Sequence, residues 1–226
     1  FYGCTSLTKV NGIENVKFIN QHAFYGCNLQ GEINLENAVA VADYAFASGD
    51  ITYYYENKDT GEAGWTTKKG GTNEFNSVVL SEKTQSIGTY AFYGSTKLES
   101  VTFKADKVQL GMCAFADCRS LKEISVNANV IPTGIFDGCT GLTKVTLGKD
   151  VAQIGEYAFR GARVTEFTID KDNKVFTSIE GKPYILNNDG TEILYVAPGV
   201  SGELRIDDSK IVKVAYGAFS GNTRLT

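Results

Sequence analysis

A phenylalanine recurs at a nearly constant interval along the whole of this 226-residue chain. Most copies follow an alanine, at Ala23-Phe24, Ala45-Phe46, Ala91-Phe92, Ala114-Phe115, Ala158-Phe159 and Ala218-Phe219, and Phe1 and Phe136 take the same position in the pattern. Successive phenylalanines lie 23, 22, 46, 23, 21, 23 and 60 residues apart, so two intervals contain one period plus 23 or 37 extra residues. This period predicts a solenoid, because a unit of about 23 residues cannot enclose a core without its neighbours.

The residues around each phenylalanine predict the layout of one coil, meaning one turn of the solenoid. An aliphatic residue lies five positions earlier, at Ile19, Val41, Ile87, Leu110, Ile131, Ile154 and Val214. A short run of alternating apolar residues follows, as in Leu121-x-x-Ile124-x-Val126, and this period of two indicates a half-buried strand. Stacking in register would place successive rings at roughly the 4.8 Å strand spacing, and each buried ring would contribute about 1.5–3 kcal/mol.

The complete motif stands in Leu142-Thr143-Lys144-Val145-Thr146-Leu147 followed by Ile154-Gly155-Glu156-Tyr157-Ala158-Phe159. It resembles the BspA-like leucine-rich repeats of bacterial surface proteins, and the resemblance covers the chain apart from two insertions. The resemblance implies an α/β-type, strand-dominated leucine-rich repeat solenoid, a right-handed superhelix of about eight coils with a strand sheet on its concave side. Because the chain begins and ends in mid-pattern, we interpret residues 1–226 as a single domain and a fragment of a longer chain.

The resemblance also carries the functional expectation. Members of this family are cell-surface proteins implicated in adhesion and host-protein binding, which implies an extracellular location and extracellular or host proteins as partners. Two alternatives stay open: a structural stalk without its own ligand, and a carbohydrate-binding surface that uses Trp65 and the tyrosines. A net charge of −4 without a basic cluster argues against a nucleic-acid partner. No apolar run approaches the roughly 18 residues of a membrane helix, so we expect no direct membrane insertion.

The first insertion, residues 53–74, predicts a β-hairpin that projects from the stack. Two β-prone stretches flank the turn-forming residues Asn57 to Gly61. The stretches carry the only tryptophan and a triple tyrosine, and aromatic side chains with polar groups suit contacts with proteins or sugars. The candidate ligand-binding residues here are Tyr53, Tyr54, Tyr55 and Trp65. The alternative is that these rings fold back and cover the solenoid.

The second insertion, residues 170–202, predicts another β-hairpin, because Asn188-Asp189-Gly190 lies between two apolar runs. The same hairpin recurs in BspA-like proteins, where it looks like a variant of the repeat, so the resemblance implies a structural role. The acidic residues Asp170 and Asp172 lack the spacing and terminal Glu of a calcium loop. We interpret them as turn-capping residues.

The predicted strands also offer solvent-facing columns in which a ligand could lie. One column contains small hydroxyl and amide residues, and its candidate ligand-binding members are Thr102, Ser125, Thr146 and Thr168. A neighbouring column has mixed charge and contains Lys9, Glu32, Ser100, Glu123, Lys144 and Glu166. Solenoids bind partners across such columns, although solubility alone would also favour polar residues there.

The residues that support catalysis or metal binding are sparse. Four of the five cysteines, Cys4, Cys27, Cys118 and Cys139, share one position that Ser95 and Ala162 also fill, so we expect free thiols at a site that requires a small side chain. Cys113 and the only histidine, His22, occupy the position at which Tyr44, Tyr90 and Tyr157 stand in other coils. We therefore expect no catalytic residues, no metal site and no cofactor, and a protein that is not an enzyme.

Overall fold

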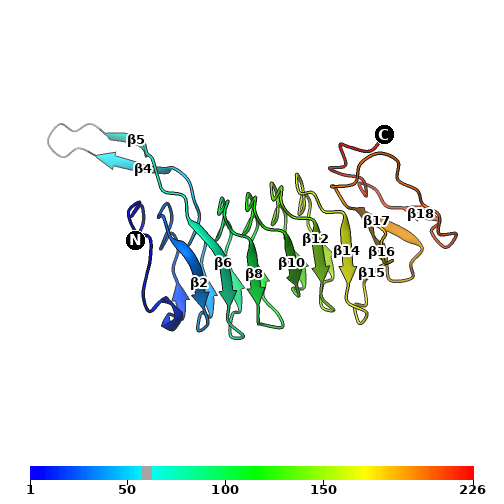
Figure 1. The fold of residues 1–226 in the computed structure, drawn as a ribbon, viewed down its shortest axis with the longest axis horizontal. Coiled ribbons are helices and arrows are strands. Elements are labelled where there is room, and N and C mark those ends of the chain that lie inside the picture. The colour runs from blue at the N-terminus through cyan, green and yellow to red at the C-terminus, as the bar shows by residue number, and fades with distance from the viewer. Residues whose placement is uncertain (57–62) are drawn as a thin grey trace.

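The computed structural model describes residues 1–56 and 63–226, and for residues 51–56 and 63–68 it describes the backbone alone. The chain forms an elongated, strand-dominated β-solenoid, in which successive coils lie side by side along the long axis (Figure 1). The described elements are η1 (Ile13–Asn15), β1 (Phe18–Ile19), β2 (Gln30–Leu35), β3 (Ala40–Val41), β4 (Ile51–Glu56), β5 (Ala63–Lys68), β6 (Glu74–Leu80), β7 (Ser86–Ile87), β8 (Ser100–Phe103), β9 (Gln109–Leu110), β10 (Glu123–Val126), β11 (Val130–Ile131), β12 (Lys144–Leu147), β13 (Gln153–Ile154), β14 (Glu166–Ile169), β15 (Phe176–Ser178), β16 (Tyr184–Asn187), β17 (Glu192–Val196) and β18 (Lys213–Val214).

Each central coil contributes one strand to each of two parallel stacks. The longer strands pair in the orders β2-β6-β8 and β10-β12-β14, and the two-residue strands pair in the orders β1-β3-β7-β9 and β11-β13. The register is that of the repeat, so Val145 of β12 lies between Ile124 of β10 and Phe167 of β14. The alternation of apolar residues therefore places one side of each longer strand in the core.

The predicted phenylalanine stack runs through the core. The rings of Phe46, Phe92 and Phe115 are fully buried, with centroids 5.3 and 5.1 Å apart and planes within 3° of parallel. The stack continues through Phe136 to Phe159 with centroid distances of 6.0 and 5.8 Å. The Ala-Phe segments form turns, and the described residues include no α-helix and no helix that could cross a bilayer.

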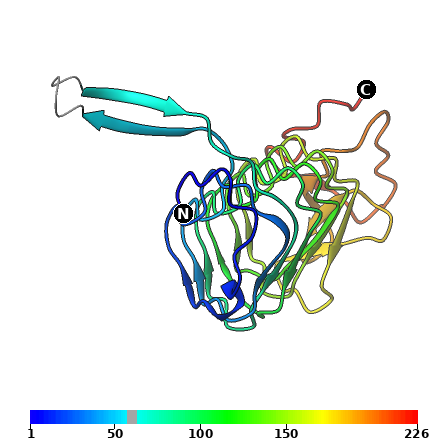
Figure 2. The same cartoon turned by 60° about the vertical axis from the view of Figure 1, so that its left-hand side comes forward.

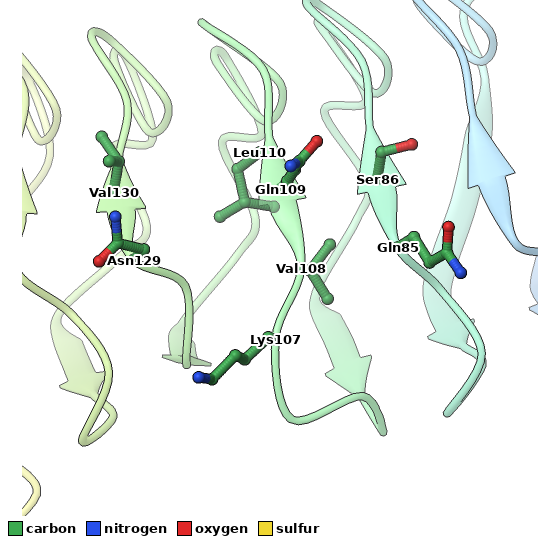
Figure 3. Close-up of a pocket in the computed structure, with 8 residues that line it drawn as sticks. All are labelled: Gln85, Ser86, Lys107, Val108, Gln109, Leu110, Asn129 and Val130. Atoms are coloured by element: carbon green, nitrogen blue, oxygen red, sulfur yellow. The ribbon is translucent and has the colours of Figure 1, made fainter.

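The first long interval contains the antiparallel pair β4–β5, which extends away from the coils in both views (Figures 1 and 2). The chain then returns into the stack at Asn73, whose side chain is fully buried. Its amide nitrogen donates to the carbonyls of Phe24 and Phe46 at 3.2 and 2.9 Å, and its side-chain oxygen accepts from the N–H of Leu29 at 3.0 Å. Asn73 therefore ties together three positions of the neighbouring coils at the base of the hairpin.

The second long interval enters the stack instead of leaving it. Strands β15, β16 and β17 form an antiparallel sheet, and β18 of the last coil pairs in parallel with β17. The ring of Tyr195 packs edge-on against Phe159 at 5.8 Å, in the place where the next phenylalanine of the stack would lie. A second, small core forms here around Tyr184, Leu186 and Ile193.

Candidate interaction surfaces

The structure brings together the four candidate residues on the strand face. Ser125 of β10 pairs with Thr146 of β12, which pairs with Thr168 of β14, and Thr102 lies on the preceding strand β8. These residues line one shallow groove of about 470 Å³, whose charged members are Glu123, Lys144 and Glu166. Val79 of β6 continues the column beside Thr102. The sequence pattern did not predict this residue, because the first insertion precedes it and interrupts the repeat.

Two of the three charged residues of this groove, Lys144 and Glu166, form an ion pair. The ammonium group of Lys144 lies 3.6 Å from the carboxylate of Glu166, and both side chains are exposed. An exposed pair of this kind contributes about 0–1 kcal/mol. The face is thus a polar surface of hydroxyl groups and mixed charge, and the aromatic residue that lines its groove, Phe103, is half-buried rather than exposed as a binding residue would be.

The candidate residues of the first insertion lie on β4 and β5. Tyr53 pairs with Thr66, Tyr54 with Trp65, and Tyr55 with Gly64. The side chains of Tyr53, Tyr54, Tyr55 and Trp65, and the turn at residues 57–62, lie outside the described parts of the structure. Their role as ligand-binding residues stays a prediction.

A third surface was not predicted as a site. We define the aromatic ridge as the six ring side chains on the turns of the first four coils, which are Tyr2, His22, Tyr25, Tyr44, Tyr90 and Tyr93. His22 stacks on Tyr44 at 5.1 Å, and Tyr44 stacks on Tyr90 at 5.0 Å. A second column lies beside the first, where Tyr2 stacks on Tyr25 at 5.6 Å and Tyr93 meets Tyr90 edge-on at 5.5 Å.

The backbone of the turns explains why these rings point outward. His22, Tyr44 and Tyr90 each lie two residues before the core phenylalanine and have φ between 55° and 56°. This left-handed conformation turns the side chain away from the core and is unfavourable for residues other than glycine. Stacking along the ridge offsets part of that cost. The repeated tyrosine position is the sequence feature that could have identified the ridge.

The ridge is rich in phenolic hydroxyl groups. Burial raises the pKa of Tyr25 and Tyr93, and hydrogen bonding with the Cys113 thiol raises the pKa of Tyr90. These phenols therefore stay protonated at neutral pH. The hydroxyl of Tyr25 donates to the carbonyl of Asp50 at 3.0 Å, which links the ridge to the base of the β4–β5 hairpin.

Three of the five cysteines are buried in the core. All five are free thiols, and Cys27, Cys118 and Cys139 are buried. The sulfur of Cys139 donates to the carbonyl of Phe115 in the preceding coil at 3.1 Å, and burial raises the pKa of this thiol to about 12. Cys4 is exposed because it belongs to the first coil. The described residues contain no cluster of three or more His, Cys, Asp or Glu side chains that could hold a metal ion.

Comparison with known proteins supports the architecture. A family model described as "BspA type Leucine rich repeat region" matches residues 1–58 and 70–180 with six copies. The pneumococcal vaccine antigen PcpA is similar in structure, with a TM-score of 0.55 and 18% identity over 88% of this chain and 54% of that one. A leucine-rich repeat protein from Bacteroides ovatus has a TM-score of 0.54 and 20% identity over 98% of this chain and 55% of that one. The chain thus spans about half the length of these structures, and at such identities they show the fold alone. No curated protein matches the sequence significantly.

Proposed function

Because this chain belongs to the BspA-type leucine-rich repeat family, we propose that it is a cell-surface protein-binding domain whose contact surface is the aromatic ridge. The partners are extracellular or host proteins, and the activity is adhesion rather than catalysis. The observation that carries the proposal is the stacked column of His22, Tyr44 and Tyr90, with rings 5.1 and 5.0 Å apart, beside the stacked pair Tyr2 and Tyr25 at 5.6 Å.

The packing of the rings favours a protein partner. His22, Tyr44 and Tyr90 cover one another's faces, with interplanar angles of 8° and 17°, so an approaching molecule meets their edges and hydroxyl groups. Ring edges carry partial positive charge and phenols donate hydrogen bonds, so both attract carbonyl and carboxylate oxygens. Tyrosines in such clusters are typical centres of protein interfaces.

The ridge is a better candidate than the strand face for two reasons. It offers large side chains that are already held in place by their neighbours, so little conformational entropy is lost when a partner binds. It also adjoins the base of the β4–β5 hairpin through Tyr25 and Asp50, so the hairpin can extend the same contact surface. The strand-face residues Thr102, Ser125, Thr146 and Thr168 remain a second proposed contact surface with a smaller energetic contribution.

Other coils of the chain show which substitutions at the ridge positions are compatible with the turn. Glycine replaces the first-column aromatic at Gly134 and Gly217, and alanine replaces the second-column tyrosine at Ala47 and Ala116, so the chain itself tolerates both changes. The test variant is therefore Tyr90→Gly combined with Tyr93→Ala. A matched control changes the strand face through Thr102→Ala, Ser125→Ala and Thr146→Ala.

Binding is measured by surface plasmon resonance on a panel of immobilised extracellular-matrix proteins. The ridge variant should lose about 2 kcal/mol or more on the proteins that bind, which is about 30-fold in Kd. The strand-face control should stay within about threefold. Undiminished binding by the ridge variant would refute the ridge as the contact surface, and absence of binding to every matrix protein would favour the stalk.

A further inference from the structure

The turns of neighbouring coils are joined by a ladder of backbone hydrogen bonds, and this ladder ends at the seventh coil. In the coils of Phe24, Phe46, Phe92, Phe115 and Phe136, three N–H groups donate to the next turn. The last such set runs from Gly134, Phe136 and Gly138 to the carbonyls of Glu156, Ala158 and Arg160 at 3.0, 2.9 and 2.8 Å. The equivalent N–H groups of Tyr157, Phe159 and Gly161 have no hydrogen-bond partner among the residues that the structure describes.

The second insertion causes this interruption. Tyr195 packs its ring against Phe159, and the N–H of Val196 donates to the carbonyl of Ala218 at 2.8 Å. That carbonyl is the one that the N–H of Phe159 would reach in an uninterrupted stack. The turns of the seventh and eighth coils are therefore held apart by β17.

An open cleft of about 600 Å³ lies between the two turns. Its walls are Tyr157 and Arg160 on one side, Tyr216 and Ser220 on the other, with Tyr195 between them. Around Gly217, which also lines the cleft, a side chain would meet nothing within 4 Å, so the space there is open. Of the three N–H groups without a partner among the described residues, that of Tyr157 belongs to a residue that lines the cleft.

The aromatic rings of this cleft differ from those of the ridge. Tyr157 holds the ridge position, but glycines hold that position in both adjacent coils, at Gly134 and Gly217. Tyr157 is 49% exposed, and Tyr216 is fully exposed. Neither ring is stacked on another ring in the described part of the chain. Arg160 covers one face of Tyr157, so the ring faces available to a ligand are those of Tyr216 and the opposite face of Tyr157.

The charges of the cleft favour a neutral ligand. Arg160 lies over the Tyr157 ring at 5.0 Å and its guanidinium is already paired with the Asp137 carboxylate, with one hydrogen bond of 3.0 Å. Glu156 adds an exposed carboxylate at the rim. Among the described residues that line the cleft, Arg160 is the only cation and is already paired, and Glu156 would repel a second anion.

We propose that this cleft binds one ring of a neutral pyranose sugar. A pyranose presents a flat apolar face of C–H groups and a rim of hydroxyls that both donate and accept hydrogen bonds. The face of Tyr216, and the face of Tyr157 that Arg160 leaves uncovered, suit the C–H face. The N–H of Tyr157 donates to a sugar oxygen, and the carboxylate of Glu156 accepts from a sugar hydroxyl.

This site is separate from the aromatic ridge and does not rest on the proposed function. The carbohydrate surface predicted from the sequence uses Trp65 and the tyrosines of the first insertion, whereas the cleft lies at the other end of the solenoid. The cleft forms because β17 enters the stack, and no sequence motif predicts this entry.

The test measures binding of neutral methyl pyranosides of glucose, galactose, mannose and N-acetylglucosamine, with glucuronate as the acidic comparator, by titration calorimetry and ligand-observed NMR. At least one neutral sugar should bind, and glucuronate should bind more weakly. The variants Tyr216→Ala and Tyr157→Gly should each raise its Kd at least about tenfold. Met112→Ala is the matched control, because Met112 is an exposed residue at the position of Tyr216 in another coil.

The same variants distinguish the sugar site from the protein-binding ridge. The ridge variant Tyr90→Gly with Tyr93→Ala should keep its sugar affinity, while Tyr216→Ala should keep its affinity for matrix proteins. Absence of binding by every neutral pyranoside would overturn the proposal, as would tighter binding of glucuronate. Sugar binding that survives both cleft variants, or a cleft that takes peptides from a random library and no sugar, would overturn it as well.

Discussion

Removing a ring from the middle of the phenylalanine stack should destabilise the protein far more than removing one from its end. Phe115 is fully buried, stacks on Phe92 at 5.1 Å and on Phe136 at 6.0 Å, and meets Phe103 edge-on at 6.1 Å. Phe115→Ala deletes the buried ring and leaves a cavity, for which the expected loss is about 3–5 kcal/mol. We place the loss in the upper half of that range, because three ring contacts disappear together.

The comparison variants are at the first and last coils. Phe1 is 64% exposed and stacks only on Phe24 at 5.3 Å, and Phe219 is 40% exposed. Partial burial and one ring contact correspond to about 1 kcal/mol for Phe1→Ala. Urea unfolding followed by far-UV circular dichroism gives the free energies, and tyrosine fluorescence checks that the transition is a single one. Equal losses for Phe115→Ala and Phe1→Ala would refute the idea that stability comes from stacking along the solenoid.

Two further predictions concern the buried polar groups. Asn73→Ala should lower the free energy of unfolding, measured by urea titration, by about 3 kcal/mol, because it leaves the N–H of Leu29 without its side-chain acceptor and removes the donors to two carbonyls. The control Asn76→Ala changes an exposed side chain and should be nearly neutral. An equal loss in the two variants would contradict this account. Burial raises the pKa of the Cys139 thiol from 9.0 to about 12, so its contribution to stability is complete below pH 9 and is lost as the pH rises toward 12, by about 1.4 kcal/mol per pH unit. Cys139→Ala should therefore show a shallower alkaline loss of stability than the unmodified chain, and identical pH profiles would argue against a buried neutral thiol.

Most of the stack could be predicted from the sequence because its positions are set by burial. Two patterns indicate which side chains are buried: the alternation from Leu142 to Leu147 and the periodic phenylalanines. The register of β10, β12 and β14 follows from these patterns. The small-residue position was also predicted, and the structure adds its physical reason. In the buried copies the thiol donates to a phenylalanine carbonyl of the preceding coil, as Cys139 does to Phe115.

The interaction surfaces were harder to predict because they depend on backbone geometry rather than on burial. The recurrent tyrosine position was visible in the sequence, but only the positive φ of residues such as Tyr44 and Tyr90 shows that these rings stand outside the core and stack on one another. Val79 was missed on the strand face because the coil that contains it is the one that the hairpin interrupts.

The two long intervals look alike as departures from the period, yet they have opposite effects on the stack. After the first insertion the backbone ladder is unbroken, since the N–H of Phe46 donates to the carbonyl of Ala91 at 2.7 Å. The second insertion contains the apolar residues Ile185, Leu186 and Ile193, which are fully or almost fully buried and could not have been left in water on a projecting hairpin. Their burial draws β16 and β17 into the stack, and this separates the flanking turns. A solenoid with identical coils has all of its backbone groups paired, so it presents few unsatisfied donors to a small ligand. An insertion that enters the stack leaves such donors without partners at one defined place, and this is the physical basis of the sugar site proposed beside Tyr157.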